Sequence, residues 1–368
     1  MEINPTADLT THKPKFYHSF LARIDPYIDP SNSPNWPLLA LLRFLLAFVV
    51  FASHVGEHTA SSGPLSAIST LGAFEAILGF LLISGYSIGM SITKSRSGYL
   101  LRRVKRIYPV YIACLILTFL VSPLPVTAGF VGMLCLNVVF LNHVVVPTSY
   151  VGPAWTLALE VWLYILAPSL LRFSYRTSLY LVYFSFACFC LYTCARSLFN
   201  LPYYAGTYFG INLLLLSFIW ILGFMLAIFH KKKKATTFHI LFVVGMYFGL
   251  NALIQLAFRL KNGAYNLIPD DCLDFLTRGI CLAIICYFII NQRKFTIRSS
   301  SVKSLFNFLG NISYPLYLSH AAFLVLFIRF GISNWFLLSL YSLVGAAVFY
   351  WLFDSFYRRQ TTLPSTQN

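Results

Sequence analysis

The chain has 368 residues, of which 58% are hydrophobic and only 10% are charged. A typical soluble domain has about 45–50% apolar and about 25% charged residues, so this composition excludes a water-soluble globular protein. The net charge is +16. In so apolar a chain, basic residues gather in cytoplasmic loops beside anionic lipid, so this charge indicates membrane lipids as partners and no nucleic acid.

Eleven apolar runs are candidate membrane segments, because a helix of about 20 apolar residues crosses a bilayer. They cover residues 37–55, 72–92, 107–123, 129–146, 154–171, 179–199, 209–229, 238–258, 273–291, 308–330 and 334–354. No remaining stretch is long enough for a sizeable soluble domain, so any chemistry is expected in or between the helices. The eight cysteines form no C-x-x-C pair and have no histidine at ligand spacing, so no metal site is expected.

The basic clusters decide how many of these runs cross the membrane. If residues 129–146 crossed, the lysines at 231–234 would fall on the opposite side from the cluster at 94–106. If a re-entrant or outer-surface segment lies near 129–150 instead, every basic cluster falls on the cytoplasmic side. We therefore predict an all-α polytopic membrane protein with about ten transmembrane helices and both termini in the cytoplasm. The expected division is a cytoplasmic tail at 1–35, a transmembrane domain at 36–356 and a cytoplasmic tail at 357–368.

Arg43 and His54 lie in the first apolar run, where a charge near the bilayer centre costs at least about 2.5–3.5 kcal/mol. Eleven residues at about 100° each bring His54 back to within about 20° of Arg43, about 16 Å along the helix axis. The two side chains can therefore line one channel, with Arg43 in the inner half and His54 near the outer mouth. The alternative is that each side chain snorkels to the headgroups on its own side.

Glu160 is a second costly group inside an apolar run. Tyr164 shares its helix face, whereas Trp155 lies about 140° away around the helix. A carboxylate in this position can orient a partner or accept a proton from it. The alternative is a structural ion pair with Arg43 or Arg278.

His320 and the Ser84-Gly85 pair are two further positions that stand out in the apolar runs. His320 lies in the middle of the run at 308–330, near Tyr317, and a lone histidine inside a helix is more often a hydrogen-bonded packing group than a catalyst. Ser84 and Gly85 favour close helix packing through small residues.

The segment from Arg102 to Pro109 carries four basic residues in five positions. It is interpreted as a loop before the third apolar run. Such a cluster binds lipid headgroups, or it forms a phosphate site at the inner mouth of a cavity and holds a cytosolic polyanion by charge-assisted hydrogen bonds.

Five segments in this order resemble acyltransferase family 3, a family of integral membrane proteins that O-acylate sugars. The first is Arg43 with His54, which is similar to the family's Arg or Lys, ten residues, His. The others are Gly79-Phe-Leu-Leu-Ile-Ser-Gly85-Tyr, Arg102-Arg-Val-Lys-Arg106-Ile-Tyr-Pro109, Trp155-Thr-Leu-Ala-Leu-Glu160 with Tyr164 and Pro168, and Leu309-Gly-Asn-Ile-Ser-Tyr-Pro-Leu-Tyr-Leu-Ser-His320.

The resemblance implies transfer of an acyl group, most simply acetyl, from cytosolic acyl-CoA to a hydroxyl of a sugar or cell-surface glycan, free or lipid-linked. Acyl-CoA is then a donor substrate, and no bound cofactor is expected. The expected location is a bacterial inner membrane. His54 is expected to act as general base or as acyl-imidazole carrier, with Arg43 beside the pantetheine and Glu160 holding the histidine or the acceptor. The residues expected to bind CoA or substrate are Arg102, Arg103, Arg106, Ser84, Trp155, Tyr164, Tyr317 and His320.

Other functions remain open at this point. A transporter or flippase for a lipid-linked sugar would use Arg43, His54 and Glu160 as an ion or substrate path, although no internal repeat is evident. A glycan polymerase would be expected to carry a larger outer loop than residues 124–153. The acceptor could also be a small cytosolic sugar or amino acid.

Overall fold

A computed structural model describes residues 33–59, 62–146, 148–261 and 270–355. The predicted tails therefore lie outside the described residues, apart from residues 33–35. The helices are α2 (Trp36–His58), α3 (Leu65–Ser69), α4 (Ala73–Lys94), α5 (Tyr99–Val121), α6 (Ala128–Val138), α7 (Ala154–Leu170), α8 (Tyr175–Phe199), η2 (Tyr204–Gly206), α9 (Ile211–Ile228), η3 (His230–Lys232), α10 (Lys233–Lys261), α11 (Asp270–Asn291), η4 (Gln292–Lys294), α12 (Ser300–Arg329), α13 (Trp335–Phe349) and the π-helical turn η5 (Tyr350–Ser355).

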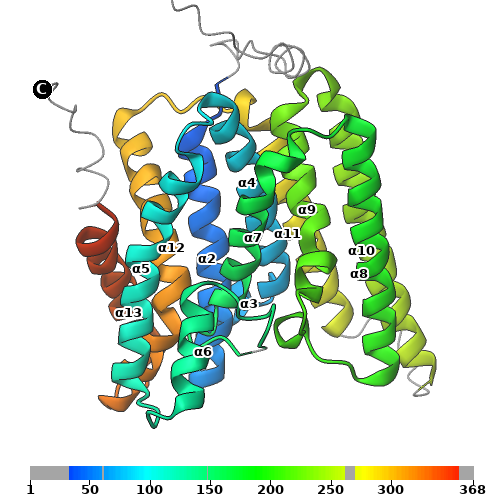
Figure 1. Cartoon of the computed structure of the whole chain (residues 1–368). Coiled ribbons are helices and arrows are strands. Elements are labelled where there is room, and N and C mark those ends of the chain that lie inside the picture. Colours follow the sequence, from blue (N-terminus) through cyan, green and yellow to red (C-terminus); the bar gives the residue numbers. More distant parts are fainter. Residues whose placement is uncertain (1–32, 60–61, 147, 262–269, 356–368) are drawn as a thin grey trace, which may run out of the picture. The chain divides into compact units, whose positions relative to one another are not determined.

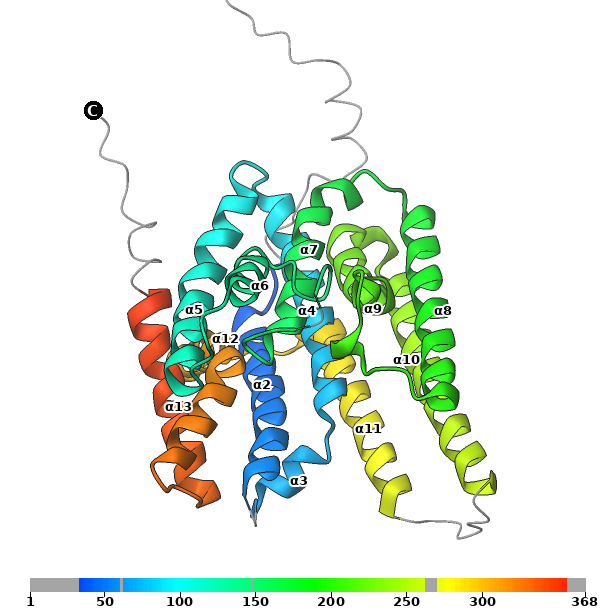
Figure 2. The same cartoon turned by 60° about the horizontal axis from the view of Figure 1, so that its bottom comes forward.

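The described residues form a bundle of helices without a β-strand, which confirms the all-α polytopic prediction. Nine of these helices are long and apolar enough to cross a membrane. The 17-residue α7 runs alongside them as a tenth element, and the 11-residue α6 does not traverse the bundle (Figure 1). In the bundle, α5, α12 and α13 lie on one side and α8 and α10 on the other, with α2 and α4 between them (Figure 2).

Successive long helices run in opposite directions, so the basic clusters gather at one end (Figure 1). We call this the basic end: α2, α5, α8, α10 and α12 begin there. It receives the clusters at 94–106, 172–176, 231–234 and 293–303. The other end, where α2 finishes at His58 and α4 begins, is called the opposite end.

The segment at 129–146 is helical only as far as Val138. The loop that follows is organised by Asn137, which is fully buried. Its side-chain amide donates to the Met133 and Thr148 carbonyls at 2.9 and 3.2 Å, and its side-chain oxygen accepts from the Tyr150 backbone N–H at 3.1 Å. Irregular backbone at membrane depth needs such internal partners. The short helix and its ordered loop agree with the predicted re-entrant or surface segment.

The start of α5 corrects one expectation. The basic stretch was expected to be a loop before residue 107, but α5 begins at Tyr99 and includes it. Gly98, with φ of 62°, makes the left-handed turn that separates α4 from this helix. Arg and Lys have high helix propensity, and their long side chains reach the interface from a helix end, so the stretch needs no loop.

Two close helix contacts position the site. Gly85 of α4 faces the Trp220 carbonyl of α9, and Gly223 of α9 faces the Leu82 carbonyl of α4, so no space remains for a Cβ atom at either glycine. Gly310 of α12 packs on the backbone of Ala40 in α2 in the same way. Small residues allow such approaches between membrane helices. The helices that carry the predicted site residues are therefore held close together.

Candidate functional site

A cavity of about 120 Å³ lies among α2, α4, α5, α7 and α12. Of the residues predicted from the sequence, seven line it. They are Arg43, Ser84, Arg103, Arg106, Glu160, Tyr164 and Tyr317. All five sequence motifs thus contribute to one site, the fifth, at 309–320, through Ser313, Tyr314 and Tyr317. His54 is not part of this lining.

Glu160 occupies the centre of a polar network between α4 and α7. Its Oε2 accepts a hydrogen bond from Ser84 Oγ at 3.0 Å and another from the Tyr164 hydroxyl. Trp220 Nε1 of α9 donates to Ser84 Oγ at 3.3 Å. The carboxylate is held by hydroxyl groups in a fixed orientation, as a group that positions a substrate requires.

The cavity has a positive charge balance, with Arg43, Arg103 and Arg106 set against Glu160. The charges of Arg106 and Arg43 act on the Glu160 carboxylate. The ion pair considered with Arg278 is ruled out by position, because the Arg278 side chain lies beside Gly72, which precedes α4 at the opposite end. Three guanidinium groups around one carboxylate leave a surplus of charge that suits an anionic ligand.

The neighbouring arginines of α5 have different surroundings. Arg103 donates to Ser91 Oγ and lies over the Tyr99 ring, 5.6 Å from its centroid. Arg102 does not line the cavity. Its guanidinium donates to the backbone carbonyls of Ser95, at 2.5 Å, and Ser97. The structure therefore places Arg102 on the turn between α4 and α5, away from the cavity.

An aromatic layer formed by Phe80, Tyr317 and His320 lies between the cavity and His54. The hydroxyls of Tyr317 and Thr156 lie 2.7 Å apart, and the Tyr317 ring lies 5.4 Å from that of Phe80. The Tyr317 ring is also 6.3 Å from His320. His320 is fully buried, and its Nδ1 lies 3.2 Å from the Leu316 carbonyl.

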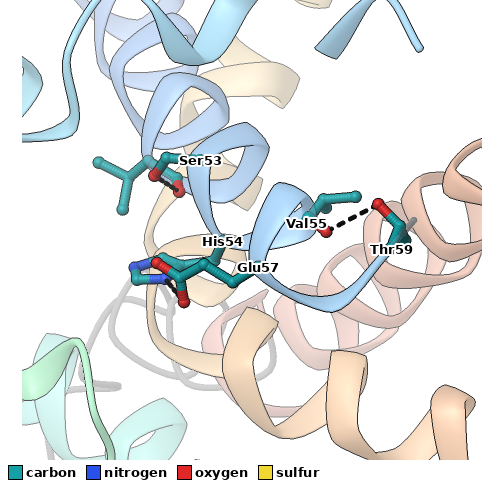
Figure 3. A network of polar contacts seen from close by, with 6 residues as sticks. Ser53, His54, Val55, Glu57 and Thr59 are labelled. Carbon is teal, nitrogen blue, oxygen red and sulfur yellow. Dashed lines mark hydrogen bonds and ion pairs between the residues drawn. The ribbon is translucent and has the colours of Figure 1, made fainter. Parts of the chain in front are cut away.

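His54 lies beyond this layer, where its ring stacks on His320 at 5.1 Å with an interplanar angle of 27°. Its Nδ1 is 3.2 Å from Glu57 Oε2 (Figure 3). The side chain of His54 is 39% exposed and that of Glu57 is 64% exposed. Arg43 and His54 share α2 as predicted, but Arg43 faces the cavity and His54 faces the opposite end, with Tyr317 and His320 between the two positions.

Two other residues singled out from the sequence, Trp155 and Gly85, contribute to helix packing. Trp155 is buried and does not line the cavity, because it points about 140° away from Glu160 around α7. Gly85 makes the close α4–α9 contact that its small size favours, and Ser84 joins the Glu160 network.

Among the polar residues of this region, sequence reasoning missed Thr156, Tyr314 and Glu57. Thr156 lies one position after a motif tryptophan, and Tyr314 lines the cavity while its hydroxyl donates to the Ile107 carbonyl at 3.0 Å. Glu57 could have been found from its spacing, since a residue three positions after His54 shares its helix face.

Comparison with known proteins gives three findings. The family model described as acyltransferase domain, acyltransferase 3, matches residues 36–354. A protein of Acidianus two-tailed virus, named as a proposed acetyltransferase, is 36% identical over 97 residues, which cover 26% of this chain and 28% of that protein. The chain therefore spans under a third of this relative, and no solved structure matches it. Because the family model covers most of the chain, this polytopic membrane protein belongs to the acyltransferase 3 family.

Proposed function

We propose that the protein transfers an acyl group, most simply acetyl, from acyl-CoA to a hydroxyl of a sugar or cell-surface glycan, free or lipid-linked. The observation that carries this proposal is the cavity in which Arg43, Arg103 and Arg106 surround the Glu160 network, one aromatic layer away from His54. The family assignment supports acyl transfer. The donor, the acceptor and the residue roles are our inference from the chemistry of the site.

The cationic side of the cavity suits the donor. Acyl-CoA carries a pyrophosphate and a 3′-phosphate, and guanidinium groups bind phosphate oxygens with two parallel hydrogen bonds. Arg103 and Arg106 lie in the first turns of α5, near the basic end, and Arg43 lines the same cavity from α2. A donor that enters from the basic end would place its phosphates on α5 and direct its pantetheine arm past Arg43 toward Tyr317.

His54 is the proposed general base. Its imidazole removes the proton from the acceptor hydroxyl, and that oxygen attacks the thioester carbonyl. A C–O bond forms, the C–S bond breaks, and the CoA thiolate takes the proton from the imidazolium. Histidine can both accept and donate a proton near neutral pH, so the residue ends the cycle in its starting form. Glu160 and its hydroxyl partners would hold the acyl donor in place for this step.

The same proposal includes the membrane in which the protein lies and the direction in which it is inserted. Basic clusters favour the cytoplasmic side of a bacterial inner membrane, so the basic end and both termini would face the cytoplasm. Acyl-CoA is made in the cytosol and would meet the basic end. The exposed His54 would face the other side, where a cell-surface glycan is reached.

The test uses the full chain in proteoliposomes, with radiolabelled acetyl-CoA and membranes of the producing cell as the source of acceptor. The expected product carries label that mild alkali releases, as an O-acyl ester does. We expect His54→Ala to remove at least about 99% of this transfer, since general base catalysis contributes about 10²–10⁴-fold. Full activity of His54→Ala, or label that resists alkali, would contradict the proposal.

A further inference from the structure

Glu57 lies one helical turn after His54, and the proposed chemistry has not used it. The two side chains approach each other at 3.2 Å between Nδ1 and Oε2 (Figure 3). Glu57 is 64% exposed, and exposed ion pairs of this kind contribute only about 0–1 kcal/mol to stability. A carboxylate that faces solvent on α2 is not needed for folding, so its contact with His54 calls for a different explanation.

The contact determines which ring nitrogen of His54 carries the proton. A carboxylate only accepts hydrogen bonds, so the nitrogen next to it, Nδ1, is the donor. In the neutral imidazole the other nitrogen, Nε2, then holds the lone pair. An orienting acceptor on one nitrogen makes the other nitrogen the base.

His320 restricts the same ring from a second direction. It stacks on His54 at 5.1 Å, and its own Nδ1 faces the Leu316 carbonyl, which only accepts. The proton of His320 is therefore on Nδ1, and its buried Nε2 has no partner. His320 presents no hydrogen atom that could compete for the His54 lone pair, and its flat face keeps the His54 ring in one plane.

Among the described residues, Glu57 is the one carboxylate within salt-bridge distance of His54. In α4, Glu75 accepts from the Tyr247 hydroxyl at 2.7 Å. In α12, Arg329 follows His320 by nine positions, which is about half a turn around the helix. His58 is exposed at the end of α2. In the described residues of α3 and α13 no Asp, Glu, Lys, Arg or His occurs. Glu57 is thus the carboxylate that acts on His54.

We infer that Glu57 is a positioning residue for the transfer, which holds His54 with its Nδ1 proton on the carboxylate and its Nε2 lone pair toward the acceptor hydroxyl. The inference rests on the proposed role of His54. When Nε2 takes the acceptor proton, both ring nitrogens are protonated, and the carboxylate stabilises the imidazolium until the CoA thiolate removes that proton. Glu57 itself gains and loses no proton.

The test compares Glu57→Ala, Glu57→Gln and Glu57→Asp with the unchanged chain in the proteoliposome assay. We expect Glu57→Ala to lower kcat at least about tenfold, a part of the general-base contribution. The KM for acetyl-CoA should stay within about twofold, because Glu57 lies outside the cavity that would bind the donor. Glu57→Asp should recover most of kcat, whereas Glu57→Gln should stay low because it lacks the charge that stabilises the imidazolium.

Added formate distinguishes a role of Glu57 in the reaction from a purely structural role. Since Glu57 is exposed, a small carboxylate can occupy the space that Glu57→Ala leaves, so formate should raise its kcat several-fold, and chloride at equal ionic strength should not. Asp274→Ala removes another carboxylate at the opposite end, on α11, and should leave kcat unchanged. If Glu57→Ala keeps kcat within twofold while His54→Ala is inactive, this inference fails and the proposed function stands. If His54→Ala is active, the proposed function fails as well.

Discussion

Ser84 of α4 donates a hydrogen bond to Glu160 of α7 across 76 residues of sequence, with 3.0 Å between Oγ and Oε2. This bond joins two motifs that have no relation in the linear sequence. The same serine oxygen lies 3.3 Å from Trp220 Nε1, so one hydroxyl connects α4, α7 and α9. A single side chain therefore links the orientation of the carboxylate to the packing of three helices.

Replacing Ser84 with alanine should weaken both the site and the fold. The change leaves the Trp220 indole N–H without its acceptor and Glu160 without one donor. Leaving a buried polar group unsatisfied costs about 1–3 kcal/mol. We expect a lower thermal unfolding midpoint in detergent and reduced transfer. Ser87→Ala is the matched control, since Ser87 lines the same cavity on the same helix but its Oγ has no partner. Equal effects of the two changes would contradict this prediction.

The α4–α9 contact should not tolerate a methyl group. In Gly85→Ala or Gly223→Ala the added Cβ would meet a backbone carbonyl, which cannot rotate away as a side chain can. Overpacking of this kind costs about 1–3 kcal/mol. Gly249→Ala in α10 serves as control, because nothing lies within 4 Å of the position of its Cβ. Thermal unfolding should rank both contact variants below the control, and an unchanged midpoint in Gly85→Ala would refute the close contact.

Two arginines of α5, Arg106 and Arg102, should differ in their effect on the KM for acetyl-CoA. Arg106→Gln removes a charge from the cavity, so the KM for acetyl-CoA should rise about tenfold, in line with roughly 1.5–3 kcal/mol for a charge-assisted hydrogen bond. Arg102→Gln removes donors to the Ser95 and Ser97 carbonyls instead, so it should lower stability and leave this KM within about twofold. A larger KM change in Arg102→Gln would reverse the assignment.

His143, in the loop between α6 and α7, should make stability depend on pH. Burial lowers the pKa of His143 from 6.5 to about 4, with an opposing contribution from the Thr207 backbone. The unfolded chain thus binds this proton at higher pH than the folded chain. The stabilisation is present above pH 6.5 and is lost as the pH falls toward 4, by up to about 3 kcal/mol.

The measurement is the unfolding midpoint in detergent between pH 7 and pH 4 for the unchanged chain and His143→Gln. The variant should lose less stability over this range, although its value at pH 7 can be lower. His58→Gln, which changes an exposed histidine, should follow the unchanged chain. Parallel curves for His143→Gln and the unchanged chain would exclude His143 as a source of the pH dependence.

Much of the fold could be predicted because apolar runs and basic clusters report directly on the membrane. The predicted run at 37–55 became α2 (Trp36–His58), and the basic clusters singled out 129–146, where the structure has only the 11-residue α6. The start of α5 could not be placed by hydropathy, because its first turns are polar and snorkel to the interface.

The site was predictable only within each helix. Helix periodicity correctly put Tyr164 beside Glu160 and Trp155 away from it. Periodicity gives the direction of a side chain around its own helix but says nothing about what a neighbouring helix inserts. The expectation that Arg43 and His54 line one channel therefore could not anticipate the layer of Tyr317 and His320 between them, which depends on the register of α12 against α2.

The aromatic layer has a consequence for the electrical potential across the membrane. A membrane protein with polar groups at both faces needs a barrier to ion flow. Each elementary charge that crosses a potential of 100 mV releases about 2.3 kcal/mol. In the described part of the chain Tyr317 and Phe80 line the cavity, and His54 lies outside its lining, against His320. In our proposal this layer insulates the two compartments electrically, so that an acyl group passes from one to the other while protons and ions stay where they are.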